Sequence, residues 1–478
     1  MVKAFAATAI LCILAALAIT LIPFDIPFKM PEIVAFLALS AAIISPYIAA
    51  AIQRKFDPLE PVFFVSLLTF VYFVLIPGSL VLRPNGYLYF GVNYRPMLPL
   101  ALRMSLVALV GYYFGYYVGK RRWQPRGLWV VSTDANAARR YAWMGIILAT
   151  ILVVLWIDLG DIPLWALNVF DERAEYGTWY QLSEALIGYL YVARLAYLPL
   201  LLLALAYRQT RNPGMSWLVV YAAVGVFYIM LGVRIALLLL LLSTSIYLYL
   251  EHGKRPKLWH LIVLAIGLFM FNGFLGIARA RGQIGIPFVG LQASWNVFLE
   301  GNALVYGICM ISFLFPTVLP FQHGQILLSE LTLPIPRMLW PEKPGNLLIA
   351  YLQDTFSVHY SPAVFGGWYA DFGLLGPFLF MALLGVACAY VYRVWETYRH
   401  EPAARVLLAL TLSLLLIVYT RVNAVGFTWV TFVILPLLAV QFLATRRQRR
   451  GAFGSQPPAP FRRKDASSES MSKSRLAG

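Results

Sequence analysis

Four arginines lie at the ends of long apolar stretches and a fifth, Arg194, lies about ten residues inside one, where a charged side chain is costly. They are Arg194 in YVARLAY, Arg234 in GVRIALLLL, Arg279 and Arg281 in GIARARGQIG, and Arg421 in VYTRVNAVG. Arginine inside a membrane span costs at least about 2.5–3.5 kcal/mol and therefore usually marks a polar cavity or a ligand path. Because a guanidinium group stays protonated and often donates two hydrogen bonds to phosphate oxygens, the five together predict binding of a lipid diphosphate. The alternative for each arginine is that it snorkels to lipid headgroups or pairs with an acid.

A second group of cations lies in the proline-rich stretch LPIPRMLWPEKPGN at 333–346. Arg337 and Lys343 stand there among prolines, which stiffen the backbone. A rigid loop with two cations suits sugar and phosphate better than a mobile loop, so both residues are further candidates for diphosphate binding. A proline-braced lid without ligand contacts is the alternative.

Aromatic residues follow this stretch: Tyr360, then Trp368 and Tyr369 in GGWYADFG at 366–373. Their rings offer flat apolar surfaces with a polar handle, which could pack against sugar faces. All three are therefore candidates for sugar binding. An aromatic belt at the membrane interface, where Trp and Tyr are enriched, is the alternative.

Residues that could accept a proton lie in the same region. His359 in SVHYSP is the first candidate for a general base, because the unperturbed pKa of histidine lies close to neutral. Asp371 is the second candidate, although it stands just before an expected helix start and could cap that helix instead. Other titratable residues of the region are His323, Glu300 and Asp354.

Composition places these residues in a membrane protein built from helices. Apolar residues make up 61% of the 478 and charged residues 12%, whereas a soluble domain carries roughly 25% charged residues. The mean hydropathy is +0.74. Because the apolar blocks are long enough to cross a hydrocarbon core of about 30 Å, we expect an all-α polytopic membrane protein.

The same composition excludes several other classes of function. The net charge of +17 lies mostly in short loops and in the tail, so it does not indicate nucleic-acid binding. The three cysteines, Cys12, Cys309 and Cys388, have unrelated spacings, so we expect neither a disulfide framework nor a metal site. No ATP-binding motif is present, and we expect no cofactor.

About twelve transmembrane helices are expected from the apolar blocks, at 4–23, 31–52, 61–82, 98–119, 141–159, 185–207, 215–232, 235–250, 258–277, 374–395, 403–420 and 425–443. Alternating these spans from a cytoplasmic N-terminus places most of the 38 lysines and arginines on the cytoplasmic side. This is the positive-inside pattern, so both termini are expected in the cytoplasm. The expected organisation is spans one to nine at 1–277, a large outer loop at 278–373, spans ten to twelve at 374–443 and a disordered basic tail at 444–478.

The large outer loop contains an apolar run at 303–320 that is long enough to be a span. Pro316 and Pro320 interrupt its end, and one more crossing would place the basic residues of 393–405 on the wrong side. We therefore expect short helices or re-entrant segments, which are tolerated where protein or a water-filled cavity shields the backbone. Fourteen spans, with a second extra crossing at 326–340, is the alternative.

Three stretches together resemble the Wzy-type family, the polymerases of O-antigen and exopolysaccharide repeat units. They are GVRIALLLLLL at 232–242, the exit of the next span at Arg279, and PIPRMLWPEKP followed by GGWYADFGLLG within 334–376. The family's layout is also similar, with many spans and one dominant outer loop before the last helices. The resemblance implies a GT-C-like glycosyltransferase of the bacterial inner membrane that uses undecaprenyl-diphosphate-linked glycans at the periplasmic face, without metal or nucleotide sugar.

The function implied by this resemblance is polymerisation of the linked repeat units with release of undecaprenyl diphosphate. A chain-length regulator and a flippase of the same pathway are the implied partners, besides the lipid bilayer. Related ligases use an outer-loop histidine, which either His323 or His359 could supply. The alternatives are an O-antigen ligase and a flippase or transporter of the same lipid. A polyprenyl-phosphate-sugar transferase is disfavoured, because the first outer loop carries Asp25 alone rather than an acidic pair.

Overall fold

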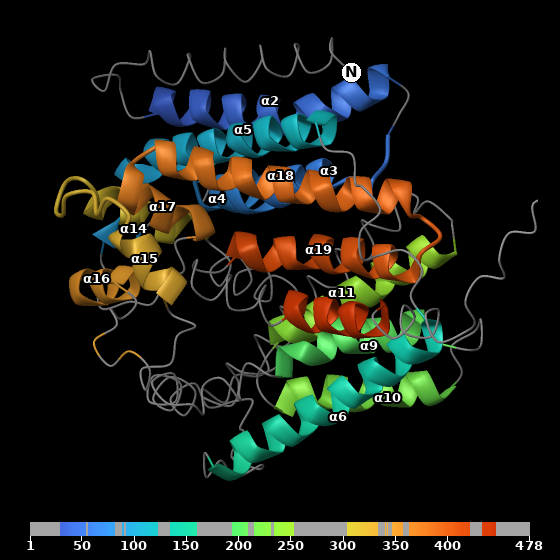
Figure 1. Cartoon of the computed structure of the whole chain (residues 1–478). Helices are drawn as coiled ribbons and strands as arrows, with labels where there is room; N and C mark the ends of the chain where they lie inside the picture. The colour runs from blue at the N-terminus through green and yellow to red at the C-terminus, as the bar shows by residue number, and fades with distance from the viewer. Residues whose placement is uncertain are drawn as a thin grey trace, which may run out of the picture.

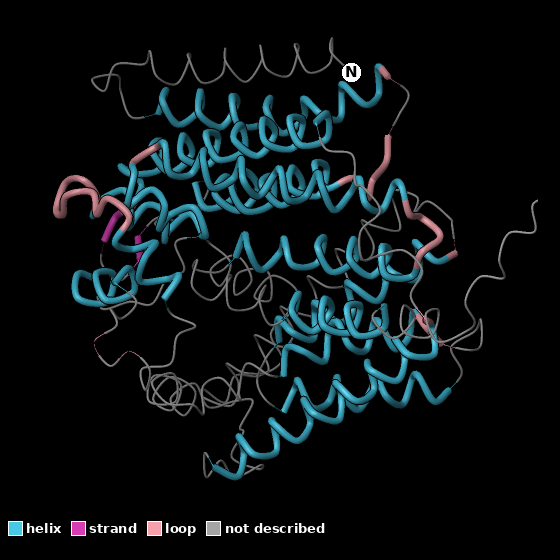
Figure 2. The backbone as a smooth tube through the Cα atoms, in the orientation of Figure 1, coloured by secondary structure: helices cyan, strands magenta, loops and turns pink. Residues whose placement is uncertain are grey.

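The structure of the protein is a computed structural model, which describes more than half of the residues. The described residues are 29–53, 56–81, 88–89, 92–122, 134–159, 194–208, 215–230, 234–252, 304–332, 340, 342, 347–356, 363–420 and 433–445. Within them the fold is helical apart from one pair of two-residue antiparallel strands, β1 (Leu88–Tyr89) and β2 (Val92–Asn93) (Figure 2). The all-α prediction is confirmed to this extent.

Among the described residues, six helices are long and apolar enough to cross a membrane, which fits a membrane protein. They are α2 (Lys29–Ile52), the segment Pro61–Gly78 that begins with α3 (Pro61–Phe70), α5 (Leu98–Arg122), α6 (Ala135–Leu159), α18 (Leu375–Thr397) and α19 (Pro402–Thr420). Further apolar helices are shorter: α9 (Tyr197–Ala206), α10 (Met215–Met230), α11 (Arg234–Glu251), α14 (Leu304–Leu314) and a helix at Val433–Thr445. The expected spans at 4–23 and 258–277 lie outside the described residues.

The membrane-length helices lie side by side in one continuous stack (Figure 1). α5 packs between α2 and α18, α18 packs on α19, α19 packs on α11 and α9, and α6 packs on α9. Four shorter helices lie together on the left in Figure 1, at one end of the stacked helices themselves: α14, α15 (Gln325–Thr332), α16 (Leu347–Phe356) and α17 (Ala363–Phe372). The predicted outer loop thus contains short helices in its described part.

A row of glycines brings α5 and α18 together. Three glycines spaced four residues apart line one face of α5: Gly111, Gly115 and Gly119. A Cβ atom at Gly115 would overlap the carbonyl oxygen of Ala382, and one at Gly385 in α18 would overlap the carbonyl oxygen of Tyr112. Small residues in this arrangement allow helix backbones to approach closely, and van der Waals packing then stabilises the pair within a membrane.

Two ion pairs lie at opposite ends of α5. Arg95, just before the helix, binds Glu32 of α2 through two contacts, Nε to Oε1 at 3.1 Å and Nη2 to Oε2 at 3.2 Å. Lys120, in the last turn, binds Oε1 of Glu60 at 2.6 Å, and the hydroxyl of Tyr116 donates to the same oxygen at 3.0 Å. The polar contacts thus tie α5 to its neighbours at its two ends.

α14 is a half-length helix inserted into this stack. It packs on α17, on α5 and on the π-helical turn η1 (Val71–Leu75), which continues α3 and leads into α4 (Ile76–Val81). With the exception of Phe313, its residues are buried. Its 11 residues extend about 16 Å, roughly half of a hydrocarbon core. π-helical turns often occur at functional sites, so the contact between α14 and η1 makes this region a candidate site.

Candidate functional site

The structure describes part of the predicted site. The predicted residues that lie outside the described chain are Arg279, Arg281, Arg337, Lys343, His359, Tyr360 and Arg421. Arg194 and Arg234 are described in their backbone, and Trp368, Tyr369 and Asp371 are described with their side chains. The assignments on the residues outside the described chain stay predictions.

Both described arginines of the predicted diphosphate site begin a helical segment. Arg194 is the first residue of the 3-10 turn η3 (Arg194–Ala196), which leads directly into α9, and Arg234 is the first residue of α11. Backbone N–H groups at the start of a helix are free to bind an anion, and the helix dipole favours negative charge there. A helix start at Arg234 is compatible with the predicted anion binding, which stays a prediction.

Asp371 lies in the last turn of α17, and its carboxylate caps α15. Its Oδ1 accepts the backbone N–H of Ile326 at 3.1 Å, and its Oδ2 accepts that of Leu327 at 2.8 Å. Its carbonyl oxygen also accepts the N–H of His323 at 3.1 Å. A buried carboxylate at a helix start satisfies N–H groups that have no partner within the helix and interacts favourably with the helix dipole. The helix that Asp371 caps is thus α15, and not the helix that follows Asp371 in the chain.

We expect Asp371→Ala to lower the stability of the protein, because the buried N–H group of Ile326 and the half-buried N–H group of Leu327 would lose their acceptor. The expected loss is about 1–3 kcal/mol, measured as a lower midpoint of unfolding for the purified protein in detergent. Asp354→Ala, at an exposed position of α16, is the control and should leave the midpoint unchanged. An Asp371→Ala protein with unchanged midpoint but no activity would instead favour the predicted role as a base.

Tyr369 is packed inside this group of helices. Its side chain is 4% exposed, its hydroxyl donates to the carbonyl oxygen of Phe315 at 3.3 Å, and its ring meets that of Phe321 edge to face at 5.7 Å. Burial raises the pKa of the Tyr369 hydroxyl. These contacts give the ring a packing role, and its contact with sugar stays a prediction.

Trp368 differs from its neighbour because it keeps an unused hydrogen-bond donor. Its ring packs on Phe372 and Phe380, with centroids 6.2 and 5.1 Å away. Its Nε1 is shielded from solvent, yet it has no acceptor among the described residues. A buried indole N–H usually has a partner. The predicted sugar-binding residue thus has a buried donor without an acceptor among the described residues, and its contact with sugar stays a prediction.

His323 lies beside Asp371, in the turn between α14 and α15. Its side chain is exposed, and its backbone adopts a φ of 50°, a left-handed conformation that is uncommon for residues other than glycine. Gly324 continues the turn with a φ of 95°. Of the two histidines that the resemblance leaves open, His323 is the one within the described chain.

Arg103 is a further cation within an apolar stretch, in addition to the predicted arginines. It lies in the second turn of α5, inside the apolar stretch expected at 98–119, and is half-buried. The same rule that selected Arg194, a charge inside an apolar block, would have found it. Arg103 therefore joins the candidates for anion binding.

The described residues contain no group of three or more His, Cys, Asp or Glu side chains that could hold a metal ion. The site that remains consists of the capped start of α15, the exposed His323 and the unpaired indole N–H of Trp368, all at the end of the stack where α14 is inserted. Comparisons with family models, curated proteins and solved structures found no match to this chain.

Proposed function

We propose that this chain is a membrane glycosyltransferase that joins lipid-diphosphate-linked oligosaccharide repeat units into a polysaccharide at the outer face of the bacterial inner membrane. The observation that supports this most directly is the group of short helices, α14 to α17, at one end of the membrane-length helices (Figure 1). A half-length helix ends inside the membrane, so its terminal backbone groups and the adjoining turn bring polar groups below the headgroups, where the backbone of a regular span is fully hydrogen-bonded. Twelve spans in a GT-C-like layout, with both termini in the cytoplasm, belong to this proposal.

In the proposed reaction the polymer linked to undecaprenyl diphosphate is the donor. A hydroxyl oxygen at the far end of a new lipid-linked repeat attacks the anomeric carbon of the donor. The bond from that carbon to the diphosphate oxygen breaks, its electron pair stays on the diphosphate, and the hydroxyl proton passes to a base. Preset guanidinium groups would stabilise the charge that develops on the leaving diphosphate.

The roles of individual residues follow from this step. Arg234 and Arg279 would bind the leaving diphosphate, with Arg194, Arg281, Arg337, Lys343 and Arg421 in support. His359 is the first candidate for the base, which would add roughly 10²–10⁴-fold to the rate. His323 is the alternative, and its exposed position beside Asp371 favours it among the described residues. The unpaired N–H of Trp368 suits a contact with sugar.

Deletion of the gene tests this function directly. We expect cells to make single repeat units but no long polymer, and lipid-linked repeats to accumulate, as measured by gel analysis of polysaccharide and mass spectrometry of extracted lipids. Polymer that still forms but stays on its lipid carrier would indicate a ligase instead. Absence of repeat units from the outer leaflet would indicate a flippase.

A further inference from the structure

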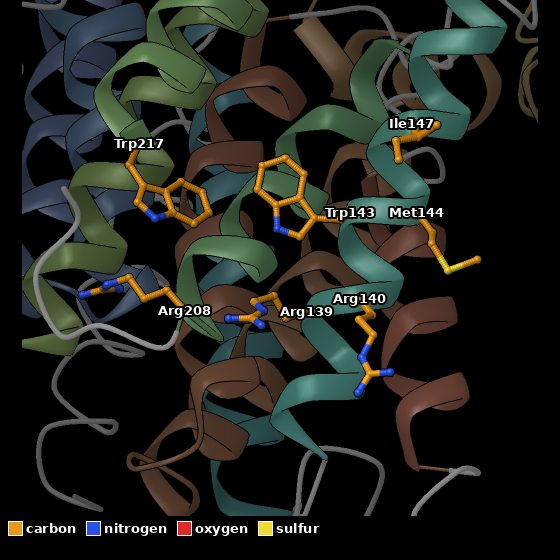
Figure 3. Close-up of a pocket in the computed structure, with 7 residues that line it drawn as sticks. All are labelled: Arg139, Arg140, Trp143, Met144, Ile147, Arg208 and Trp217. Carbon is orange, nitrogen blue, oxygen red and sulfur yellow. The ribbon is translucent and has the colours of Figure 1, made fainter. Parts of the chain in front are cut away.

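A cavity of about 560 Å³ opens between α6, the end of α9 and the start of α10, away from the site described above. Figure 3 shows three arginines, Arg139, Arg140 and Arg208, and the indole rings of Trp143 and Trp217 around it. The arginines follow the N-terminus of α6 or the C-terminus of α9, at the ends that the positive-inside pattern places in the cytoplasm. With this predicted topology the cavity lies at the level of the lipid headgroups of the inner leaflet.

The charge of this cavity is positive and largely uncompensated. Arg208 is paired, since its Nη2 binds Oε2 of Glu251 at 3.0 Å. Arg139 and Arg140 have no ion pair with any acid of the described chain. The nearby Asp134 instead accepts the backbone N–H groups that start α6, those of Asn136 at 2.9 Å and Ala137 at 3.2 Å. Within the described chain, the guanidinium groups of Arg139 and Arg140 thus have no acidic partner and are suited to an external anion.

Two tryptophans beside the arginines indicate how deep in the membrane such an anion would lie. The rings of Trp143 and Trp217 lie 5.9 Å apart between centroids. Trp143 follows Arg139 and Arg140 by one helical turn, towards the apolar part of α6. Indole rings are enriched at the membrane interface, below the charged groups and above the hydrocarbon core. Guanidinium groups above and indoles below match the phosphate and the ester region of a phospholipid.

An apolar groove continues from the cavity along α6. A second cavity of about 330 Å³ shares Ile147 with the first, and the residues of the described chain that line it belong to α6. Ile147, Ile151 and Val154 recur at helical spacing on one face and are 59%, 51% and 57% exposed. Such a groove, open at the side and beginning at a charged cavity, has the shape and polarity that suit an acyl chain.

We propose that this surface binds an anionic diacyl phospholipid of the cytoplasmic leaflet. Its phosphate lies against Arg139 and Arg140, and one acyl chain follows the groove past Ile147, Ile151 and Val154. Basic pockets between membrane helices on the cytoplasmic side are well suited to anionic headgroups, and the apolar groove selects a lipid over a free anion. This lipid is distinct from the lipid-linked substrate of the proposed function, and its site is at the opposite end of the helices.

The test compares the full-length protein with Arg139→Gln/Arg140→Gln. The control is Arg121→Gln/Arg122→Gln, which removes the same charge from exposed residues at the end of α5. Each protein is delipidated in mild detergent and titrated with short-chain phosphatidylglycerol or phosphatidylcholine. Bound lipid is counted by native mass spectrometry. We expect the wild type and the control to bind phosphatidylglycerol in preference, and the variant to bind it about tenfold more weakly or worse.

Three results would overturn the proposal. Equal binding of phosphatidylglycerol by the variant and the wild type would remove the two arginines from the site. Equal binding of phosphatidylcholine and phosphatidylglycerol by the wild type would remove the charge preference. Complete displacement of phosphatidylglycerol by inorganic phosphate or by undecaprenyl phosphate, each at equal concentration, would show a free-anion site or a site for the isoprenoid carrier. None of these results depends on the polymerase activity, so the two proposals fail separately.

Discussion

Gly115→Ala should strongly destabilise the protein, because it adds a methyl group where two membrane-length helices are in backbone contact. The new Cβ would meet the main chain of Ala382, which has no flexible end that could move aside. α5 and α18 would have to separate along the seam that also includes Gly111 and Gly385. Overpacking of this kind costs about 1–3 kcal/mol or more. We therefore expect a clearly lower midpoint of thermal unfolding in detergent and less folded protein in size-exclusion chromatography.

Gly78→Ala is the matched control for this prediction. A Cβ at Gly78 has no neighbouring atom within 4 Å, and the residue lies in the helical segment α4. Alanine is more favourable than glycine in a helix by roughly 1 kcal/mol, so Gly78→Ala should leave the midpoint unchanged or raise it. If Gly115→Ala and Gly78→Ala unfold at the same temperature, the glycine seam does not hold α5 and α18 together.

Arg234→Ala should abolish polymer formation while the protein stays at normal abundance in the membrane. Loss of one preset donor to a developing oxyanion typically costs about 10²–10³-fold in rate. Arg234→Lys keeps the charge but loses the planar fork that binds two phosphate oxygens, so we expect strong impairment rather than rescue. Polymer length and yield in a strain that carries each variant in place of the wild type provide the measurement.

Arg121→Ala, at an exposed position in the last turn of α5, is the control and should leave polymer unchanged. The effect of Arg421→Ala should resemble that of Arg234→Ala but be milder, and His359→Ala should stop polymerisation if this histidine is the base. Wild-type polymer in the Arg234→Ala strain would show that the arginine only reaches towards lipid headgroups. The diphosphate would then have to be bound by other cations.

Helix ends were predictable where hydropathy changes abruptly along the chain. The expected spans 98–119, 374–395 and 403–420 correspond closely to α5 (Leu98–Arg122), α18 (Leu375–Thr397) and α19 (Pro402–Thr420). Hydropathy is a local property, so a window of residues contains the information that locates a span. Proline is likewise a local signal: Pro316 and Pro320 interrupt the end of the apolar run at 303–320, and α14 ends at Leu314, just before Pro316.

Contacts between distant segments were not predictable in this way. Asp371 stands before an expected helix start, which suggested that it caps its own neighbour, yet its carboxylate binds Ile326 and Leu327 of another helix. The repeat of glycine in α5 is visible in the sequence, but its partner Gly385 lies far along the chain. Pairing of this kind depends on how helices pack, and one sequence does not contain it.

The half-length of α14 has a consequence for the biogenesis of the protein. A segment of 11 residues is too short to be retained in a bilayer as an independent span, which needs about 20. Its burial therefore depends on partners that are already in place, and these lie on both sides of it in the chain: α5 before it, and α17 after it. α14 therefore acquires its final position only after α17 has been synthesised, when the spans that precede it have already entered the membrane.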